Sequence, residues 1–399
     1  MPSPVERLVR QHDGWRSGRC INLQPSENIL SHAVRMLLST DMASRYTLQS
    51  SEFVDNGGAT NSYGGTRYMD DVERLGEEFA KEVFRARFAS LKPLSGHIAS
   101  MLMISTVCSK GDTIMAVQSA DGGYDGYGPN YLADIFSLNF KPLPFDWQSF
   151  TIDSDKAAEQ IIAIKPRLVI LGQSFFLFPY NMGPIREACD DAGAFLGYDA
   201  SHVLGLVAGG EFQDPLGEGA DIVLGSTHKS FPGPQGGIFL TNDRELFRGF
   251  QRNLTWRLID NAHWNRIAAM SQALYEMKRY GRKYAERVVA NSHYLGRALE
   301  GKLSCMFSEK GYSASHQLLI DKAALAEKGF SPATLSATLE KNDIIVDTTG
   351  RLGTAEITRL GMLSRDVKAV ASLISEAIEG KMVKGKTNKL RRRFKVRYA

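Results

Sequence analysis

The sequence predicts an α/β fold, with a large domain around a central, mostly parallel sheet and a smaller C-terminal α+β domain. Between residues 113 and 240, short apolar runs alternate with a helical segment, as expected of parallel strands joined by crossovers. Polar side chains follow several of these runs, at the strand ends where such sheets carry their functional loops. After Asn242 the pattern changes to a long helical region and then to a unit with fewer, shorter strands.

The 399 residues are enough for two or three domains. We expect the long helical region to break near Gly281, where a glycine interrupts the apolar repeat. The predicted segments are an N-terminal arm and partner-contacting loop at 1–60, a large domain at 61–260, a helical connection at 261–303, a small domain at 304–380 and a basic tail at 381–399.

Composition and charge limit the function classes. No run is long and apolar enough to span a membrane, and the first ten residues lack a signal-peptide pattern. The four cysteines lie far apart with no metal-type spacing, so we expect a cytoplasmic protein without disulfides or a metal site. The net charge is +4, but the tail carries nine Lys and Arg and no acid, which leaves about −5 (4 minus 9) for the remainder. Such a tail is usually a solvated extension, so nucleic acid is an unlikely partner.

Near the N-terminus the sequence predicts a helix or an extended arm over Pro4–Trp15, and then a helix capped by Ser31. Residues 44–66 are polar and glycine-rich, and they contain Tyr46 and Tyr63. Long irregular segments of this kind are usually functional or disordered, and the two tyrosines favour a function. The next helix is expected to bury one apolar face, formed by Val72, Leu75, Phe79 and Val83.

The stretch 221–237 contains the candidate nucleophile. Asp221–Leu224 reads as a buried strand that delivers Lys229 to its end, beside Ser226 and His228. The following residues include two prolines and three glycines in seven positions, a rigid loop in which a helix would break. A lysine held there suits a Schiff-base nucleophile, because burial can lower the pKa of its amine. From spacing alone, a surface lysine in a turn is an equal alternative.

Other polar groups are placed to meet this lysine. Ser95-Gly96-His97 opens an apolar helix whose free N–H groups could hold a phosphate. Ser174, Asp199 and His202 also follow predicted strands. In the C-terminal unit, Arg351 lies between two glycines, where it could grip a carboxylate or simply be a solvated loop residue.

From Ile21 to about Met362 the sequence resembles the serine hydroxymethyltransferase family, which has the fold of the fold-type-I pyridoxal phosphate (PLP) enzymes. The resemblance rests on Ser26-Glu27-Asn28, on Tyr63-Gly64-Gly65-Thr66-Arg67-Tyr68, on the Asp-x-x-His-x-x-Gly-Leu run from Asp199, on Thr227-His228-Lys229 and on the glycine-rich loop that ends at Gly237. It implies that residues 61–260 bind PLP.

The resemblance implies a role for each candidate residue. Lys229 would hold PLP, Asp199 would pair with its ring nitrogen, and His228 would be an acid–base or positioning group. Arg351 and Ser26 would bind the substrate carboxylate, with Tyr46 and Tyr63 contributed by the neighbouring subunit of a homodimer. The remaining cofactor contacts would be Ser95, Gly96, His97, Tyr124, Ser174, His202, Ser226 and Gly237, with His202 also facing the substrate.

The sequence departs from the family where one-carbon chemistry is carried out. Leu48 stands where the family places a Glu used in hydroxymethyl transfer and folate contact, with Glu52 and Asp55 nearby but out of register. The histidines around the cofactor are replaced by Asp121 and Tyr124, of which only the tyrosine can stack.

We therefore expect an enzyme that makes or breaks the Cα–Cβ bond of a β-hydroxy or α-substituted amino acid, by aldol, transaldol or hydroxymethyl-transfer chemistry. Its co-substrate would be an aldehyde or a one-carbon donor, with weak or no dependence on tetrahydrofolate. The alternatives are an ordinary tetrahydrofolate-dependent serine/glycine hydroxymethyltransferase and, in another class, a non-catalytic PLP-fold binding protein.

Overall fold

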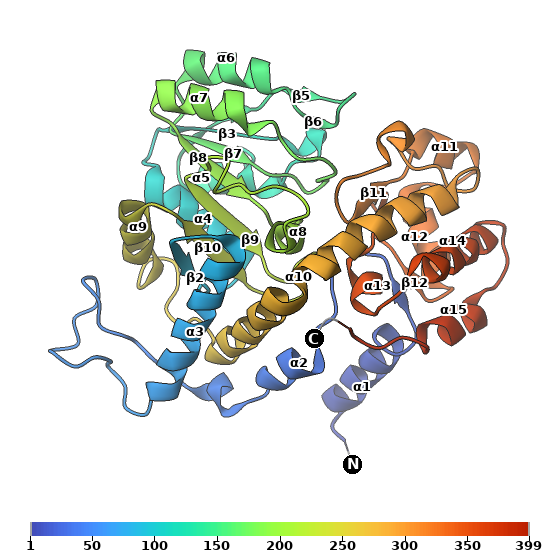
Figure 1. Ribbon diagram of the computed structural model, residues 1–399, viewed down its shortest axis with the longest axis horizontal. Helices are drawn as coiled ribbons and strands as arrows, with labels where there is room; N and C mark the ends of the chain where they lie inside the picture. The colour runs from blue at the N-terminus through green and yellow to red at the C-terminus, as the bar shows by residue number, and fades with distance from the viewer. Residues whose placement is uncertain (1, 398–399) are drawn as a thin grey trace. The chain divides into compact units, whose positions relative to one another are not determined.

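A computed structural model describes residues 2–397, which divide into two compact units (Figure 1). One unit contains Leu30–Arg282, and the other contains residues 2–29 together with residues 283–397. The N-terminal segment predicted as 1–60 is therefore shared between the units. Within the described part of the chain, no helix combines the length and apolar character needed to cross a membrane.

The unit of Leu30–Arg282 contains a seven-stranded sheet in the order β2-β10-β9-β8-β7-β3-β4. Strands β4, β3, β7, β8 and β9 run parallel, and β10 lies antiparallel between β9 and β2, which confirms the mostly parallel sheet. The strands are β2 (Phe88–Ser90), β3 (Thr113–Ala116), β4 (Asn139–Pro142), β7 (Leu168–Leu171), β8 (Phe195–Asp199), β9 (Ile222–Ser226) and β10 (Gly237–Thr241), with a separate hairpin of β5 (Phe145–Asp146) and β6 (Thr151–Ile152).

Helices surround this sheet. They are α2 (His32–Leu37), α3 (Arg67–Phe84), α4 (Gly96–Val107), α5 (Leu132–Ile135), α6 (Ser154–Ile164), α7 (Met182–Ala192), α8 (Leu204–Gly209), α9 (Arg244–Leu254) and the first half of α10 (Trp264–Leu299). Helix α4 is apolar almost all round and packs its Leu102 and Met103 in one core cluster with Ile170 and Leu224 of the sheet.

Successive side chains of a strand point to opposite faces of the sheet, so every second residue faces helix α4. On β8, Gly197 lies against Met103 of α4, and Asp199, two residues later, lies on the same face. Tyr198 projects to the opposite face, where its hydroxyl donates to Gln213 Oε1 at 3.0 Å. The end of β8 therefore points a carboxylate toward α4 and a phenol away from it.

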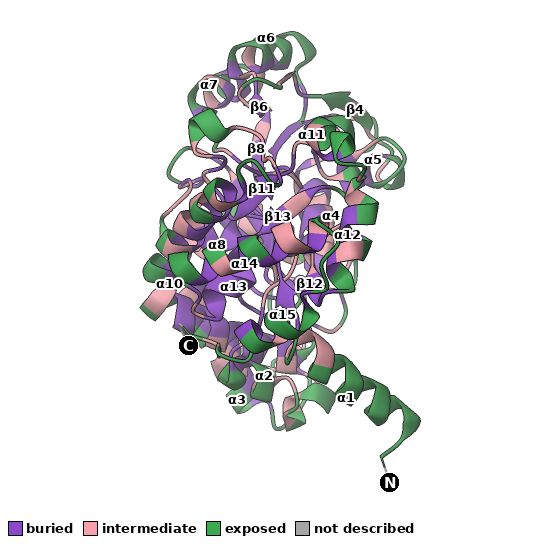
Figure 2. Ribbon diagram, turned by 90° about the vertical axis from the view of Figure 1, so that its right-hand side faces the viewer, coloured by how far each residue is buried: buried purple, intermediate pink, exposed green. Residues whose placement is uncertain are grey.

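The second unit has its own core, which includes Ile21, Leu318, Ile344 and Val370. Two short sheets lie in it, a parallel pair of β1 (Ile21–Asn22) with β12 (Ile344–Ile345) and an antiparallel pair of β11 (Gln317–Leu319) with β13 (Arg351–Gly353). Its helices are α1 (Pro4–Arg16), α11 (Lys322–Glu327), α12 (Pro332–Glu340), α13 (Ala355–Arg359), α14 (Ser364–Ile378) and α15 (Lys384–Arg391). Helix α1 buries no residue and is drawn almost wholly as exposed in Figure 2.

The predicted break near Gly281 is wrong, because α10 runs without interruption for 36 residues. A single glycine in a helix costs only about 1 kcal/mol relative to alanine. Met277 and Tyr284 on either side of Gly281 are buried, and burying a large side chain such as Met277 contributes about 1.5–3 kcal/mol, more than the glycine removes. Tertiary packing therefore overrides the local signal.

The predicted buried face of α3 is also wrong. The buried residues are Met69, Glu73, Gly76, Ala80 and Phe84, whereas Leu75 of the predicted stripe is 42% exposed. Gly76 explains the difference, since a Cβ there would lie 2.1 Å from Ser271 Oγ of α10. The two helices approach closely through this glycine, so the apolar stripe is turned away from the core.

The basic tail is not a solvated extension over its first part. Residues 384–391 form α15, in which Thr387, Leu390 and Arg391 are buried. Asn388 Nδ2 donates to Asp343 Oδ2 at 2.8 Å, and the same aspartate accepts from the indole of Trp15 at 2.8 Å. One buried carboxylate thus ties the tail to α1.

Burial of Glu356 makes the stability of this unit sensitive to pH. Desolvation raises the pKa of Glu356 to about 7, although Asn22 Nδ2 donates to its Oε2 at 2.6 Å and favours the ionised form. Because the folded-state pKa is raised, the native protein binds more protons than the unfolded chain between pH 4.5 and 7, and stability falls as pH rises through this range.

We expect Glu356→Gln to remove this loss. The difference in unfolding free energy between the variant and wild type should rise by about 2–3 kcal/mol, in favour of the variant, from pH 5 to pH 8. Urea unfolding at several pH values measures it, with Glu327→Gln, an exposed glutamate on α11, as the matched control. Parallel stability–pH curves for wild type and Glu356→Gln would contradict the assignment.

Candidate active site

Lys229 lies three residues beyond the end of β9, in a turn held by the glycine-rich loop that follows. The Thr227 N–H donates to Gly236 O at 3.1 Å, its carbonyl accepts from Gly233 N–H at 2.9 Å, and its hydroxyl donates to Pro234 O at 2.6 Å. The loop therefore folds back on Thr227 and fixes the backbone that presents Lys229, which is half-buried.

The start of helix α4 faces the same strand end. Ser95 caps the helix by accepting a hydrogen bond from Ile98 N–H at 3.1 Å. A Cβ at Gly96 would lie 2.2 Å from Ser226 Oγ, so only glycine permits this approach between helix and strand. The positive end of a 12-residue helix is thereby brought to the edge of the sheet, where an anion would be favoured.

These elements enclose a cavity of about 250 Å³. Ten of the predicted site residues line it, namely Ser95, Gly96, His97, Tyr124, Ser174, Asp199, His202, Ser226, His228 and Lys229. The sequence analysis missed two lining residues, Gln173 and Ser201, although they adjoin the predicted residues Ser174 and His202 in the chain. Gly237 does not line the cavity, since its backbone packs against the carbonyl of Ser95 and thus supports the helix start.

Asp199 is 7% exposed and is held at both carboxylate oxygens. The Ser201 N–H donates to Oδ1 at 2.9 Å, and the Tyr127 hydroxyl donates to Oδ2 at 2.8 Å. Gly172 at the end of β7 allows this placement, because a Cβ there would lie 2.7 Å from the Cβ of Asp199. The carboxylate is therefore fixed in one orientation at the cavity wall.

His228 is neutral over the physiological range. Burial, and then the neighbouring charge of Lys229, lower the pKa of its imidazole to about 4. Its Nδ1 is buried without a hydrogen-bond partner within the described residues. A neutral imidazole next to the lysine can accept a proton, which suits an acid–base or positioning role.

An aromatic side chain forms another wall. Tyr124 lines the cavity, and its hydroxyl lies 2.8 Å from His97 Nδ1. Asp121 does not line the cavity and instead accepts from Gln118 at 2.8 Å and from the Trp147 indole at 3.1 Å. Of the two residues that replace histidines, only Tyr124 is therefore available as a ring surface.

Tyr46 and Tyr63 lie elsewhere, in a groove of about 1030 Å³ whose lining is distinct from that of the Lys229 cavity. Their rings lie 4.9 Å apart. Burial and the adjacent Asp260 carboxylate raise the pKa of Tyr46 to about 12, so its phenol keeps its proton.

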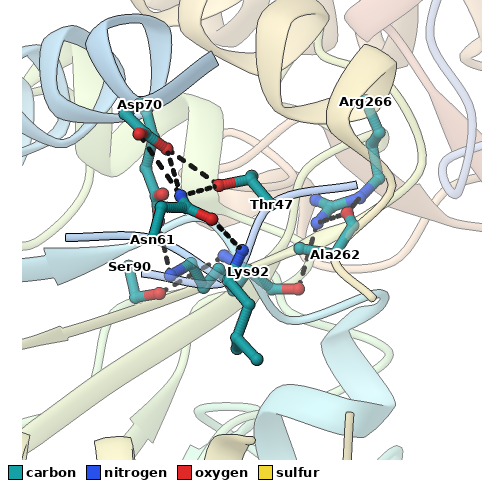
Figure 3. Close-up of polar contacts among 9 residues, drawn as sticks. Thr47, Asn61, Asp70, Ser90, Lys92, Ala262 and Arg266 are labelled. Atoms are coloured by element: carbon teal, nitrogen blue, oxygen red, sulfur yellow. Dashed lines mark hydrogen bonds and ion pairs between the residues drawn. The ribbon is translucent and has the colours of Figure 1, made fainter. Parts of the chain in front are cut away.

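Polar contacts anchor the segment that carries these tyrosines (Figure 3). Thr47 Oγ1 donates to Asp70 Oδ1 of α3 at 2.9 Å, and Asn61 Nδ2 reaches the same carboxylate at 3.4 Å. Asn61 Oδ1 accepts from the Leu48 and Tyr63 N–H groups at 3.1 Å. Asp70 therefore clamps both ends of the segment to one helix.

Ser26 and Arg351 belong to the other unit. Arg351 is the first residue of β13. Its Nε donates to Asp347 Oδ2 at 2.7 Å, so an ion pair orients the side chain, which is not simply solvated. The turn at Pro25–Ser26 packs against the same strand, because a Cβ at Gly353 would lie 2.5 Å from the Cα of Pro25. The structure thus brings these two predicted carboxylate-binding residues to one strand.

The residues of the Lys229 cavity fit PLP. The tight cradle at Gly96 and the helix start suit a phosphate, the fixed Asp199 suits a protonated ring nitrogen, and Lys229 suits its aldehyde. Together with the mostly parallel sheet, this site defines a PLP-dependent enzyme of fold type I.

Comparison with known proteins gives the family. The serine hydroxymethyltransferase family model matches residues 5–374. The serine hydroxymethyltransferase of Methanopyrus kandleri is 36% identical, covering 98% of this chain and 93% of the relative, and that of Methanocella arvoryzae is 37% identical, covering 94% and 89%. The structure of an L-threonine transaldolase from Pseudomonas fluorescens aligns with a TM-score of 0.88 at 26% identity, covering 99% and 92% of the two chains.

The chain belongs to the serine hydroxymethyltransferase family, as the sequence analysis predicted. It is a PLP-dependent transferase whose family acts on amino acids and is typically dimeric.

We expect Lys229→Ala to abolish the visible absorption of lysine-bound PLP and turnover, because no other amine lines the cavity within the described residues. The melting temperature should change little, since the side chain is only half-buried. Absorption spectra of the purified protein test this, with Lys141→Ala, an exposed lysine on β4, as the control. A Lys229→Ala protein that retains the band and the rate would exclude this nucleophile.

Proposed function

We propose that this chain makes or breaks the Cα–Cβ bond of a β-hydroxy or α-substituted amino acid, by aldol, transaldol or hydroxymethyl-transfer chemistry, with weak or no dependence on tetrahydrofolate. The observation that carries the proposal is Leu48, an apolar side chain at the position where the resemblance to the family implies a proton-transferring acid. An apolar side chain neither donates nor accepts the proton that hydroxymethyl transfer to folate needs.

The neighbouring acids are engaged elsewhere, which supports the proposal. Both carboxylate oxygens of Glu52 accept from Arg248 of α9, at 2.7 and 2.6 Å. Asp55 Oδ1 accepts from the Gly57 N–H at 2.8 Å within its own turn. Neither carboxylate takes the place of Leu48 in this arrangement.

The proposed chemistry assigns a task to each residue. PLP, when bound, supplies the electron sink for charge left on Cα. Lys229 holds the cofactor, Asp199 pairs with its ring nitrogen, and the neutral imidazole of His228 accepts or positions a proton. Arg351, with Ser26, binds the substrate carboxylate through a charge-assisted hydrogen bond.

The structural similarity to an L-threonine transaldolase also favours a substrate larger than serine. The alternative, an ordinary tetrahydrofolate-dependent serine/glycine hydroxymethyltransferase, is favoured by the names of the curated relatives. A non-catalytic PLP-fold binding protein is opposed by the complete set of Lys229, Asp199 and Arg351. The cytoplasmic location stays a prediction.

Folate dependence distinguishes these functions. We expect tetrahydrofolate to change the single-turnover rate of serine cleavage by less than about tenfold, which corresponds to about 1.4 kcal/mol in the barrier. A bulkier β-hydroxy or α-substituted amino acid should react faster than serine. Strong stimulation by folate with serine as the best substrate would make the chain an ordinary family member.

The variants Leu48→Glu and Leu48→Gln sharpen this test. If the missing acid is the reason for weak folate dependence, Leu48→Glu should increase the stimulation by folate and the isosteric Leu48→Gln should not. Glu52→Gln serves as a second control, because a wild-type response would show that Glu52 takes no part.

We also propose a homodimer in which Tyr46 and Tyr63 complete the active site of the neighbouring subunit. The groove that carries them is also lined by Val72, Leu75 and Phe79 of α3 and remains open in the single chain, where Tyr68 of its lining is 66% exposed. A contiguous exposed apolar surface of this kind usually marks a protein–protein interface.

Mixed dimers test the shared sites. Lys229→Ala and Tyr46→Phe should each lose most activity, because each damages both sites of its own homodimer. After unfolding and refolding together, half of the dimers carry one intact site, so activity should return to about a quarter of wild type. Recovery no greater than the sum of the two separate variants would contradict shared sites.

A further inference from the structure

Tyr127 is a buried phenol that neither the sequence motifs nor the cavity lining identifies. It is 1% exposed, and its ring packs in the core cluster between α4 and the sheet. Its hydroxyl donates to Asp199 Oδ2 at 2.8 Å and lies 2.8 Å from Ser100 Oγ. An ionised carboxylate can only accept, so the single phenolic proton is directed to Asp199.

Two hydrogen bonds fix the orientation of the Asp199 carboxylate. Ser201 N–H at Oδ1 and Tyr127 at Oδ2 occupy one acceptor site on each oxygen, and a carboxylate offers about four such sites. Further acceptor sites on the oriented carboxylate therefore remain for a ring N–H.

The donor itself is insulated from titration. Burial, followed by the charge of Asp199, raises the pKa of Tyr127 well above 10, with Ser100 acting in the opposite direction. The titratable ring packed against it, Tyr124, lies edge-on at 5.4 Å between centroids, and its pKa is raised too. Tyr127 thus remains a neutral donor throughout the pH range in which an enzyme of this kind works.

We propose that Tyr127 is a positioning residue that acts through Asp199, holding this carboxylate oriented for the ring nitrogen of PLP. The inference rests on the role of Asp199 in the proposed function and extends it to a residue beyond the cavity lining. Among residues 2–397, Tyr127 is the side chain that donates a hydrogen bond to Asp199, and the other donor is the backbone N–H of Ser201.

The same contact links the two ends of the cofactor site. Ser100 lies one turn into α4, and its Oγ is 3.1 Å from the carbonyl of Gly96 at the helix start. The single Ser100 proton can go to the Gly96 carbonyl or to the Tyr127 oxygen, so polar contacts through Ser100 and Tyr127 link the proposed phosphate cradle with the carboxylate. A change at Tyr127 should be felt in cofactor affinity as well as in the electronic state of the ring.

Tyr127→Phe tests the proposal, since it removes one oxygen atom. We expect the apoprotein to bind PLP about tenfold more weakly, measured by fluorescence titration without substrate, because a hydrogen bond to a charged group is lost. The pH dependence of the visible PLP absorption should shift, and kcat should fall with little change in the KM for the amino acid. The PLP titration is independent of the amino-acid reaction, so failure of the proposed function leaves it interpretable.

Tyr198→Phe is the matched control. Tyr198 is adjacent to Asp199 and fully buried, but its hydroxyl donates to the neutral Gln213 on the opposite face of β8. This variant should lose a comparable buried hydrogen bond while its PLP affinity and absorption–pH profile stay within about twofold of wild type.

Two results would overturn the proposal. One is a Tyr127→Phe protein with wild-type PLP affinity and an unchanged absorption–pH profile. The other is equal weakening in Tyr198→Phe, which would mean that loss of any buried phenol is sufficient. If Tyr127→Phe does not fold, Ser100→Ala decides, because it removes the hydroxyl that contacts the Tyr127 oxygen. PLP binding about threefold weaker than in wild type supports the proposal, and unchanged PLP binding overturns it.

Discussion

The close approach of helix α4 to the end of strand β9 is the constraint on which the active site depends. It exists because Gly96 has no side chain where a Cβ would meet Ser226 at 2.2 Å. The approach places the positive end of α4 beside β8 and β9, and these neighbouring parallel strands end at Asp199 and shortly before Lys229. This contact and the strand order together bring an anion-binding helix start, a carboxylate and an amine to the wall of one small cavity.

Burial and hydrogen bonding then define the role of each polar group in and beside the cavity. Asp199 is fixed in one orientation by two donors, whereas His228 is neutral because burial and Lys229 oppose a second positive charge. Tyr127 stays protonated because burial, and then the charge of Asp199, raise the pKa of its phenol. The low-dielectric surroundings thus give three titratable side chains three fixed roles, which suits chemistry that must stabilise charge on a substrate carbon.

The segment of residues 44–66 follows a different principle. It has little regular structure of its own and depends on Asp70 of α3, which holds Thr47 and Asn61. This anchoring presents Tyr46 and Tyr63 in a groove that is also lined by Val72, Leu75 and Phe79 of α3. In the proposed homodimer a second chain would cover this apolar surface, and the departure at Leu48 lies in the same anchored segment.

The sequence by itself determined the strand–helix alternation, the cap at Ser31, the helix start at Ser95 and the family motifs around Asp199 and Lys229, because these depend on residues close together in the chain. It did not determine the buried face of α3, the continuity of α10 or the folding of the tail onto Asp343, since periodicity shows which side chains share a face but not what covers it. The bond between Tyr127 and Asp199 joins residues 72 positions apart, and only the packing of α4 on the sheet brings them together.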